Sequence, residues 1–475
     1  MLSNKNTRYS LMEVKYPKGL LEAFGAGFSP ANGLFHFLFL ISLLLFGKFG
    51  LIFWFYYVLL NFFIYNSTPK KYLQGLPGLL LYLTPIELLG RIIRCSPYIP
   101  YEMGKYVTFI LLLLGHLQLK THKSGNLGWW IILLSLPGAF LVGNERPVKD
   151  LVFNYISLVN MGLGLSLFSN IRISSQNLKR AVFIGIWPSI VLLLYLVLIS
   201  PDLSSIDFEL GANFDTTGGF GSNQVSTILG YSFALTGFAY FFDWRFFKTT
   251  TADQILILSF FVWGLLSFSR GGIIGGILAL LLINSLGIKR PGFLSPVKFS
   301  LKAFLLFTVV FIGGFAIGNQ ITDGALLLRY QGETHGTLSG SKVKTINTLT
   351  TGRFDIFLRD IEIWNQNFFF GAGVGQSDNI GKMMGKSSQI THVEYSRLVA
   401  EHGFLGLIIG LILIILPIRR TLKEKVPIAR AWMIFAFTIS LFSTLHAATR
   451  TMITPILFSL AFLKFDDQIN IFKLK

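Results

Sequence analysis

Cysteine is almost absent from the sequence, because Cys95 is the only one in 475 residues. A single thiol cannot form a disulfide within the chain, and it cannot build a thiolate cluster for a metal ion. His335 is also isolated, because no second ligand stands near it at the spacing that zinc sites use. We therefore expect no intrachain disulfide, no metal site and no cofactor.

Charged residues are scarce as well, at 13% of the chain, whereas soluble domains carry about 25%. Hydrophobic residues make up 52% of the chain, and the mean hydropathy is +0.60. Apolar segments of about 20 residues, the length that a membrane-crossing helix needs, recur from Gly33 to Phe465. The predicted fold class is therefore all-α, a polytopic helical membrane protein with about 12–14 transmembrane helices. The candidate spans are Gly33–Phe46, Leu51–Tyr65, Leu76–Leu89, Tyr106–Leu119, Leu127–Val142, Leu151–Phe168, Ala181–Ile199, Val225–Phe242, Gln254–Phe268, Gly271–Leu286, Leu301–Gly318, Gly403–Ile418, Ala431–His446 and Met452–Leu463.

Acidic residues are fewer than basic ones, 23 against 41, which leaves a formal net charge of +18. Such an excess occurs in nucleic-acid-binding proteins, but in a membrane protein it is typical of basic residues kept in the cytoplasmic connections. Alternate connections between the candidate spans are rich in basic residues, as at Lys70 and Lys71 or at Arg245 and Lys248. We therefore expect no nucleic-acid partner, and we place both termini in the cytoplasm. The N-terminal residues also lack the pattern of a cleaved signal.

One long polar segment, residues 319–400, interrupts the apolar pattern. A loop of this length is usually functional or disordered. It divides the chain into three predicted parts. Residues 1–318 form a transmembrane helical region with about 11 spans. Residues 319–400 form a long loop on the outer face, where we expect any catalytic residues, and residues 401–475 form C-terminal transmembrane helices and a cytoplasmic tail.

The middle of this loop carries an amphipathic pattern. Phe354, Phe357, Ile361 and Trp364 recur at helical spacing with charged residues between them. This pattern predicts a helix on the membrane face or over the mouth of a cavity, with Trp364 as part of an aromatic anchor. Glycines within residues 371–375 then allow a tight turn and a close approach of the backbone. No strand precedes them, so we reject a dinucleotide-binding fingerprint. The polar, glycine-rich segment before this helix, residues 332–352, is expected to be irregular.

A second loop helix is predicted from the capping box Thr391–Glu394. His392 would then be its first helical residue, where the helix dipole disfavours a charged imidazole. A neutral histidine is what a general base needs near pH 7. The alternative is a surface histidine without catalytic function. Further along, Arg397 and Glu401 are spaced to form an ion pair on one helix face.

Arginines remain in the connections that the positive-inside pattern assigns to the outer face. A guanidinium suits phosphate or carboxylate groups better than an ammonium does. Arg270 is the sharpest example, since it lies in SFSRGGIIGG, between two apolar runs that leave almost no loop. We expect such arginines to line a cavity for an anionic, lipid-linked substrate. The alternatives are contact with lipid headgroups and pairing with a local acid. The other arginines of this set are Arg91, Arg94, Arg146 and Arg450.

A glycine-rich stretch, TTGGFGSNQ, leads into the candidate span at Val225. Asn223 stands at the entrance to this helix, where backbone N–H groups lack partners. Its side chain therefore either caps the helix or points into the outer cavity to bind a sugar or phosphate.

The chain resembles the superfamily of O-antigen ligases and O-antigen polymerases, which are bacterial envelope glycosyltransferases. The resemblance covers residues 218–416, less than half of the chain, and depends on the order and spacing of several degenerate motifs. Where the family typically has asparagine after its histidine, this chain has Val393 after His392. The motifs are the glycine-rich loop followed by Asn223, SRGG at Ser269–Gly272, the GR-helix-FGAGVG pattern of Gly352–Gly375, His392 opening a short helix, and AEHGFLGL at Ala400–Leu407.

This resemblance implies a glycosyltransferase of the bacterial inner membrane with its active site on the periplasmic face. The implied donor is a glycan on undecaprenyl pyrophosphate. The implied acceptor is a sugar hydroxyl, of lipid A-core in a ligase or of another lipid-linked glycan in a polymerase; transfer to protein is a further alternative. The reaction is expected to be metal-independent and inverting.

The resemblance also implies roles for residues. Arg270, Arg353 and Arg397 would neutralise the pyrophosphate and stabilise its departure. His392 would deprotonate the attacking hydroxyl, so that His392 and Arg270 are the predicted catalytic residues. Weaker substrate contacts are expected from Arg146, Asn223 and Glu394.

Two other classes of protein stay open. A transporter or flippase for the lipid-linked glycan predicts inverted repeats with broken helices in both halves. No repeat is visible, and the long loop occurs once. A lipid-binding or assembly protein without catalysis would have no need for His392.

Overall fold

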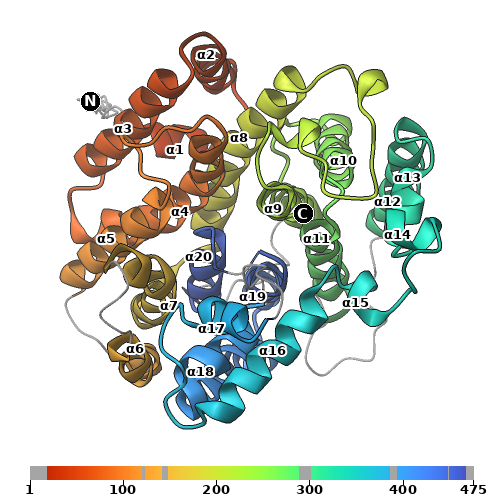
Figure 1. Cartoon of the computed structure of the whole chain (residues 1–475). Coiled ribbons are helices and arrows are strands. Elements are labelled where there is room, and N and C mark those ends of the chain that lie inside the picture. Colours follow the sequence, from red (N-terminus) through yellow and green to blue (C-terminus); the bar gives the residue numbers. More distant parts are fainter. Residues whose placement is uncertain are drawn as a thin grey trace, which may run out of the picture.

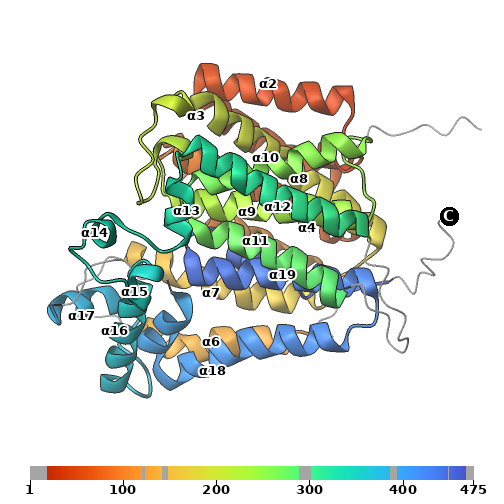
Figure 2. The same ribbon diagram turned by 90° about the vertical axis from the view of Figure 1, so that its right-hand side faces the viewer.

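A computed structural model gives the structure of the chain, and it describes residues 19–119, 124–141, 148–287, 301–385, 393–447 and 449–466. The long helices of these residues run side by side along one direction, and short helices cover one end of the bundle (Figures 1 and 2). The elements are α1 (Leu20–Phe24), α2 (Pro30–Phe46), α3 (Lys48–Tyr65), α4 (Pro69–Ile92), α5 (Met103–Gln118), α6 (Asn126–Phe140), α7 (Val148–Phe168), β1 (Arg172–Ile173), α8 (Ser175–Ile199), η1 (Leu203–Ser205), η2 (Asp215–Thr217), α9 (Ser222–Phe241), α10 (Thr250–Leu266), α11 (Arg270–Leu282), η3 (Ile283–Gly287), α12 (Leu301–Ile321), α13 (Ala325–Tyr330), α14 (His335–Leu338), α15 (Ile346–Leu349), α16 (Arg353–Gln366), α17 (Ser377–Met383), α18 (Glu394–Lys423), α19 (Pro427–His446), α20 (Ile453–Leu460) and β2 (Lys464–Phe465).

The helical fold class is confirmed, since the described residues contain only two short strands beside the helices. Every candidate span coincides with one of the helices α2–α12 or α18–α20. Within the described ranges, five helices are long and apolar enough to cross a membrane: Lys48–Tyr65, Leu151–Phe168, Ser175–Ile199, Glu394–Lys423 and Pro427–His446. The chain therefore has the helices of a membrane-embedded protein, while the full number of crossings stays a prediction.

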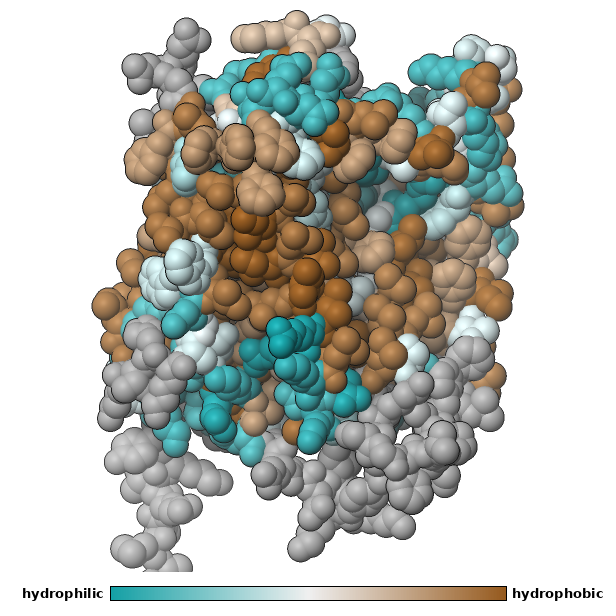
Figure 3. All heavy atoms as spheres, turned by 90° about the horizontal axis from the view of Figure 1, so that it is seen from below, coloured by the Kyte–Doolittle hydropathy of each residue, from teal (hydrophilic) through white to brown (hydrophobic). Residues whose placement is uncertain are grey.

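The outer surface of the bundle is apolar. Figure 3 shows a broad hydrophobic band across one face, with hydrophilic side chains toward both ends. Soluble proteins rarely expose continuous apolar patches of this extent, whereas a bilayer solvates them. Helices α6 and α18 contribute the exposed side chains Trp129, Trp130, Leu133, Phe140, Phe404, Leu411, Ile415 and Ile418.

Helices α9 and α11 cross closely at the centre of the bundle. A Cβ atom at Gly272 would lie 2.1 Å from the carbonyl oxygen of Ser226, and one at Gly230 would lie 2.1 Å from that of Gly272. Only glycine permits this approach of two backbones. The small residues after Arg270 therefore bring the start of α11 against the start of α9, where Asn223 lies.

Among the described residues, several connections that carry basic residues lie together at the end away from the short helices. The Phe28 amide donates to the Phe246 carbonyl at 2.8 Å, which joins the α1–α2 and α9–α10 connections. Strands β1 and β2 pair in parallel, and Arg172 lies 3.7 Å from Asp466 beside them. This gathering is what the positive-inside pattern describes. Which side of a membrane this end faces stays a prediction.

The opposite end is covered by helices α13–α17 and their connections, which we call the roof (Figure 2). The predicted helix of Arg353–Gln366 is present as α16. The expectation of an irregular segment at residues 332–352 was wrong, because two short helices, α14 and α15, form there. Thr334 and Thr345 each begin one of them with a capping box, in which Thr337 and Thr348 replace the usual Glu or Gln.

The last roof residues lead directly into α18. This helix begins at Glu394 after Val393, so the predicted capping box with Thr391 at the N-cap is wrong. The predicted second loop helix and the next span follow each other directly in α18. A kink at Gly403, where φ is 62°, separates them. The glycine-rich turn docks there, since the Ala372 amide donates to the Ala400 carbonyl at 2.9 Å. The predicted close backbone approach of this turn is confirmed.

Candidate functional site

A cavity of about 480 Å³ opens under the roof. Helices α9, α11 and α16 begin at this cavity, and α19 ends there. We call it the arginine cavity, after Arg270, Arg329 and Arg353 in its wall. Its remaining lining residues are Asn223, Ser269, Gly271, Ile274, Tyr330, Leu349, Thr350, Thr351, Phe354, Phe357, Val393, Phe442, Leu445 and His446.

Arg270 is the first residue of α11 and reaches up to the roof. Its Nη2 donates to the Leu349 carbonyl at 2.6 Å, and its Nη1 donates to the Arg329 carbonyl at 3.2 Å. Among the described residues, no carboxylate lies within ion-pair distance of its guanidinium. The alternative of a local acidic partner therefore finds no support in this part of the chain.

Arg353 is the first residue of α16 and lies on the other side of the cavity. Its Nη1 donates to Thr351 Oγ1 at 2.6 Å and to the Thr350 carbonyl at 3.1 Å. Its Nη2 donates to His446 Nδ1 at 3.2 Å, and its buried Nε has no hydrogen-bond partner in the described structure. Burial, and then the nearby charge of Arg270, lower the pKa of Arg353 to about 10.

Arg329 is the third arginine, and the sequence analysis did not select it. It lies in the last turn of α13, and its Nε donates to the Phe268 carbonyl at 3.3 Å. Burial, followed by the charges of Arg270 and Arg353, lowers the pKa of Arg329 to about 10. Burial also raises the pKa of the neighbouring Tyr330 hydroxyl above its usual value. An arginine inside the apolar run ALLLRY was the available signal, because such a position buries the charge.

His446 connects these groups and was also missed. Its Nδ1 accepts from Arg353, so its Nε2 carries the proton and donates to Ser269 Oγ at 2.9 Å. The Ser269 hydroxyl in turn donates to Asn223 Oδ1 at 2.7 Å. A Cβ atom at Gly271 would lie 2.3 Å from the His446 ring, so glycine is needed there. The result is one polar chain from Arg353 through His446 and Ser269 to Asn223.

Asn223 is not a helix cap. The N-cap of α9 is Gly221, and no side chain caps that helix. The Asn223 side chain instead lines the arginine cavity and accepts the bond from Ser269. The structure therefore agrees with the second interpretation of Asn223, in which its side-chain amide faces the cavity.

Arg397 and Glu394 lie outside the arginine cavity. The Arg397 guanidinium donates to the Glu394 carboxylate and, at 3.0 Å, to Asn154 Oδ1. The other Glu394 oxygen accepts from the Thr449 amide at 3.1 Å. The predicted pairing of Arg397 with Glu401 is wrong, because Glu394 is the closer partner and Glu401 accepts from Ser377 Oγ at 3.1 Å.

Two predicted site residues, His392 and Arg146, lie outside the described residues. Val393, which follows His392 in the sequence, lines the arginine cavity. The structure therefore brings Arg270, Arg353 and Asn223 together, adds Arg329 and His446, and sets Arg397 and Glu394 apart.

The roof is held over the cavity by a buried ion network. Arg359 Nη2 lies 3.2 Å from an oxygen of Asp360 and 3.3 Å from one of Asp378, while Ser396 Oγ donates to Asp360 at 2.6 Å. Burial raises the pKa of Asp360, and the bond from Ser396 opposes this shift. These bonds join α16, α17 and α18, so the start of α16 and its Arg353 have a fixed position.

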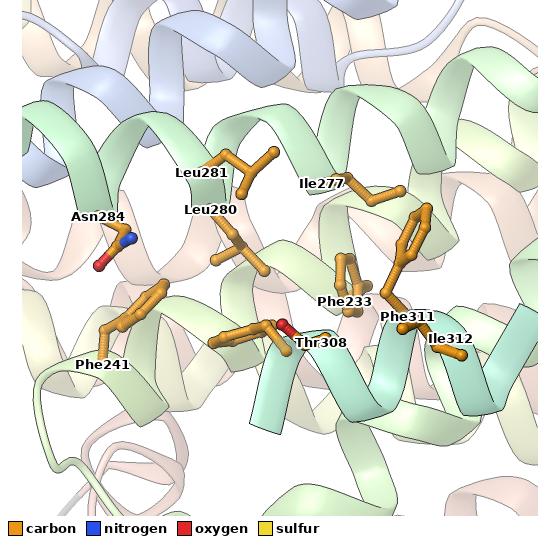
Figure 4. Close-up of a pocket in the computed structure, with 10 residues that line it drawn as sticks. Phe233, Phe241, Ile277, Leu280, Leu281, Asn284, Thr308, Phe311 and Ile312 are labelled. Atoms are coloured by element: carbon orange, nitrogen blue, oxygen red, sulfur yellow. The ribbon is translucent and has the colours of Figure 1, made fainter. Parts of the chain in front are cut away.

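An apolar pocket of about 380 Å³ lies further along α11, between α9 and α12. Figure 4 shows Ile277 of α11 facing Phe311 of α12 across it. Ile277 and Leu281 line this pocket, and Ile274 lines the arginine cavity. The spacing of these three residues puts them on one face of α11. A single helix face therefore connects a cationic cavity at the roof with an apolar pocket in the bundle.

Among the described residues, no three His, Cys, Asp or Glu side chains are grouped so that they could hold a metal ion. The chemistry that the described groups offer is recognition of an anion by arginine and proton exchange at histidine. Comparisons of the chain with models of known families and with curated proteins find no match.

Proposed function

We propose that the protein is a membrane glycosyltransferase that moves a glycan from undecaprenyl pyrophosphate to a sugar hydroxyl, as an O-antigen ligase does with lipid A-core as acceptor. The observation that carries this proposal is the pairing of a cationic cavity with an apolar pocket along one face of α11. A lipid-linked pyrophosphate has both an anionic head and an apolar tail. Guanidinium groups match phosphate oxygens in pairs, and the pocket between α9, α11 and α12 suits the tail.

The three arginines act on the leaving group in this proposal. Arg270, Arg329 and Arg353 neutralise the pyrophosphate, and their charge stabilises the further negative charge that develops as the glycosidic C–O bond breaks. The acceptor hydroxyl oxygen attacks the anomeric carbon from the opposite side, which inverts its configuration. His392 takes the hydroxyl proton as general base. Asn223 is suited to contact a sugar or phosphate oxygen, and His446 holds Arg353 in place.

The proposed location is the bacterial inner membrane, with the arginine cavity on the periplasmic face and both termini in the cytoplasm. The basic connections support this orientation, because they lie at the end opposite the roof. The proposed partners are the lipid-linked donor and a glycolipid or glycan acceptor. Arg397 and Glu394, which lie outside the arginine cavity, stay in the proposal as substrate contacts, and so does Arg146, which is not among the described residues.

A polymerase for O-antigen or another polysaccharide, or a protein O-oligosaccharyltransferase, would use the same donor chemistry with another acceptor. Deleting the gene and separating the surface glycolipids distinguishes them. Loss of a ligase leaves bare core while long glycan stays on the polyprenyl carrier. Loss of a polymerase leaves core with one repeat unit. Unchanged glycolipid with altered glycoproteins indicates a protein acceptor, and unprocessed carrier kept on the cytoplasmic side indicates a flippase.

Complementation with His392→Ala tests the catalytic part of the proposal. The variant is expected to reach the membrane in normal amount and to restore no glycan transfer, because the base is missing. Arg270→Ala is expected to give the same result through loss of pyrophosphate binding. Transfer at the wild-type level by a correctly inserted His392→Ala protein would contradict the proposal.

A further inference from the structure

A second group of cationic side chains lies next to the arginine cavity, across the first turn of α9. Asn223 lines the arginine cavity, and the next residue, Gln224, accepts a hydrogen bond of 2.6 Å from Arg91 Nη1. Arg91 Nη2 donates at 2.7 Å to the carbonyl of Arg450, in the connection between α19 and α20. The two groups of arginines therefore flank the same helix start.

Most of the charges in this second group are matched. Arg91 Nη2 lies 2.7 Å from a Glu87 oxygen, and the other Glu87 oxygen accepts from the Met452 amide at 2.8 Å. Arg397 pairs with Glu394. These buried pairs hold the ends of α4, α18 and α20 together, and removing either partner would leave a buried charge.

Arg450 is the exception. Its Nη2 is buried and has no hydrogen-bond partner among the described residues. Burial lowers the pKa of Arg450; the charges of Arg397 and Arg91 act in the same direction, while Tyr101 and Asp378 oppose them. Among the described residues, no carboxylate lies within ion-pair distance of Arg450, and the Asp378 carboxylate pairs with Arg359 at 3.3 Å. A buried guanidinium without a close anion indicates a place for one.

The exposed edge of this group is formed by Tyr101, against which the buried Arg91 packs. The Arg91 guanidinium lies 4.4 Å from the centre of the Tyr101 ring, which is 40% exposed. The Nε atom of Arg91 is also buried without a partner in the described structure. Two unused guanidinium donors, one from α4 and one from the α19–α20 connection, are thus present beside an exposed aromatic ring.

We infer that Arg450, together with Arg91 Nε and Tyr101, forms a second anion-binding subsite, which holds a phosphate group of the acceptor. The inference rests on the proposed function in assigning the anion to the acceptor. The donor pyrophosphate occupies the arginine cavity, and the acceptor anion is held on the other side of Asn223 and Gln224. An acceptor anchored there presents its hydroxyl beside the donor head. A phosphorylated glycolipid core and a second lipid-linked pyrophosphate both carry this chemistry.

The first experiment measures anion binding without any reaction. Purified full-length protein is titrated calorimetrically with inorganic pyrophosphate, which is expected to fill two classes of site. Arg450→Gln weakens one class at least about tenfold, because a charge-assisted contact is lost, and Arg270→Gln weakens the other. Arg419→Gln is the matched control, since Arg419 is exposed near the end of α18 that lies away from the roof. Equal binding by Arg450→Gln and the wild type would overturn the subsite.

Arg450 suits this test because its substitution breaks no hydrogen bond from Nη2, whereas substitution of Arg91 would leave Glu87 unpaired. The second experiment compares initial rates of transfer with each of the two acceptors. Arg450→Gln is expected to raise the acceptor KM about tenfold and to leave the donor KM unchanged. The acceptor that shows this effect is the source of the anion.

The two experiments separate the two proposals. If the wild type transfers no glycan to either acceptor but Arg450→Gln still removes one class of pyrophosphate site, the proposed function fails and the anion subsite stands. If transfer occurs and Arg450→Gln alters neither the acceptor KM nor pyrophosphate binding, the subsite fails and the proposed function stands.

Discussion

Each guanidinium of the arginine cavity is oriented by neutral atoms. Arg270 donates to two backbone carbonyls, and Arg353 donates to Thr350, Thr351 and His446. A neutral acceptor fixes the direction of a guanidinium and leaves its positive charge in place, whereas a carboxylate would cancel that charge. The cavity is therefore preorganised for an anion, and burial without an anion disfavours the charged form of these arginines.

Arg329→Gln tests whether the third arginine takes part. It removes one of three positive charges and one possible bidentate contact, so the dissociation constant for inorganic pyrophosphate is expected to rise about 10- to 100-fold. Calorimetric titration of the purified protein measures this change, with Arg419→Gln as the control for loss of a charge elsewhere. An unchanged constant would remove Arg329 from the site.

The lowered pKa values of Arg329 and Arg353, both about 10, predict a pH dependence. Both groups are charged near pH 7 and lose their protons as the pH rises through about 10, so pyrophosphate affinity is expected to fall between about pH 9 and 11. Their contribution to stability has the opposite sign, because the unfolded chain binds more protons in this range and folding is favoured as pH rises. Calorimetric titrations with pyrophosphate at several pH values measure the fall in affinity. The control is a double variant, Arg329→Gln with Arg353→Gln. Similar pH profiles for both proteins would contradict it.

At the scale of elements, α11 joins the two cavities and depends on close packing with α9. Gly272→Ala would push a methyl group into the Ser226 carbonyl oxygen, 2.1 Å away, and separate the two helix starts. We expect a loss of about 1–3 kcal/mol in stability, as for overpacked cores, together with weaker pyrophosphate binding because Arg270 moves. Thermal unfolding in detergent measures the first effect, and titration measures the second.

Gly313 in α12 is the matched control for this substitution. It is also a helical glycine, but a Cβ atom there would have no neighbour within 4 Å. Gly313→Ala is expected to leave stability unchanged or to increase it by up to about 1 kcal/mol, through the better helix propensity of alanine. If both substitutions had the same effect, the close approach of α9 and α11 would not be what positions Arg270.

Local patterns in the sequence were sufficient for the long helices and for α16. Apolar runs and helical periodicity are properties of residues that are close in the sequence, so they can be recognised without knowledge of the fold. The short helices α14 and α15 were missed because threonine replaces Glu or Gln in their capping boxes. The start of α18 was misplaced because Glu394 uses its carboxylate for Arg397 and Thr449 instead of for capping.

The candidate site was only partly predictable, because its contacts join distant parts of the chain. Arg270 stood out through its unusual place between two apolar runs, and Asn223 through its glycine-rich approach. His446 and Arg329 had no such local signal strong enough to select them. Their roles come from contacts with Ser269 and Phe268, which lie far away in the sequence and are brought close by helix packing.

At the scale of the whole molecule, hydrophilic side chains lie toward both ends of an apolar bundle on the face that Figure 3 shows. The roof and both groups of arginines lie at one end, and the described connections that contain Arg172 and Arg245 lie at the other. A membrane protein with this distribution has a definite orientation, since basic connections are retained in the cytoplasm. The orientation decides whether the arginine cavity meets substrates on the periplasmic side.

Cysteine labelling tests this orientation, and the chain is convenient for it because Cys95 is its only cysteine and is buried. In a Cys95→Ser background, Lys342→Cys places a thiol on an exposed roof position and Lys425→Cys places one on the exposed α18–α19 connection. A membrane-impermeant maleimide added to intact spheroplasts is expected to label the first variant and to spare the second until the membrane is permeabilised. Each of the two variants replaces one lysine by cysteine, so both lose the same charge. The reverse labelling pattern would put the arginine cavity in the cytoplasm, where a periplasmic transfer reaction could not use it.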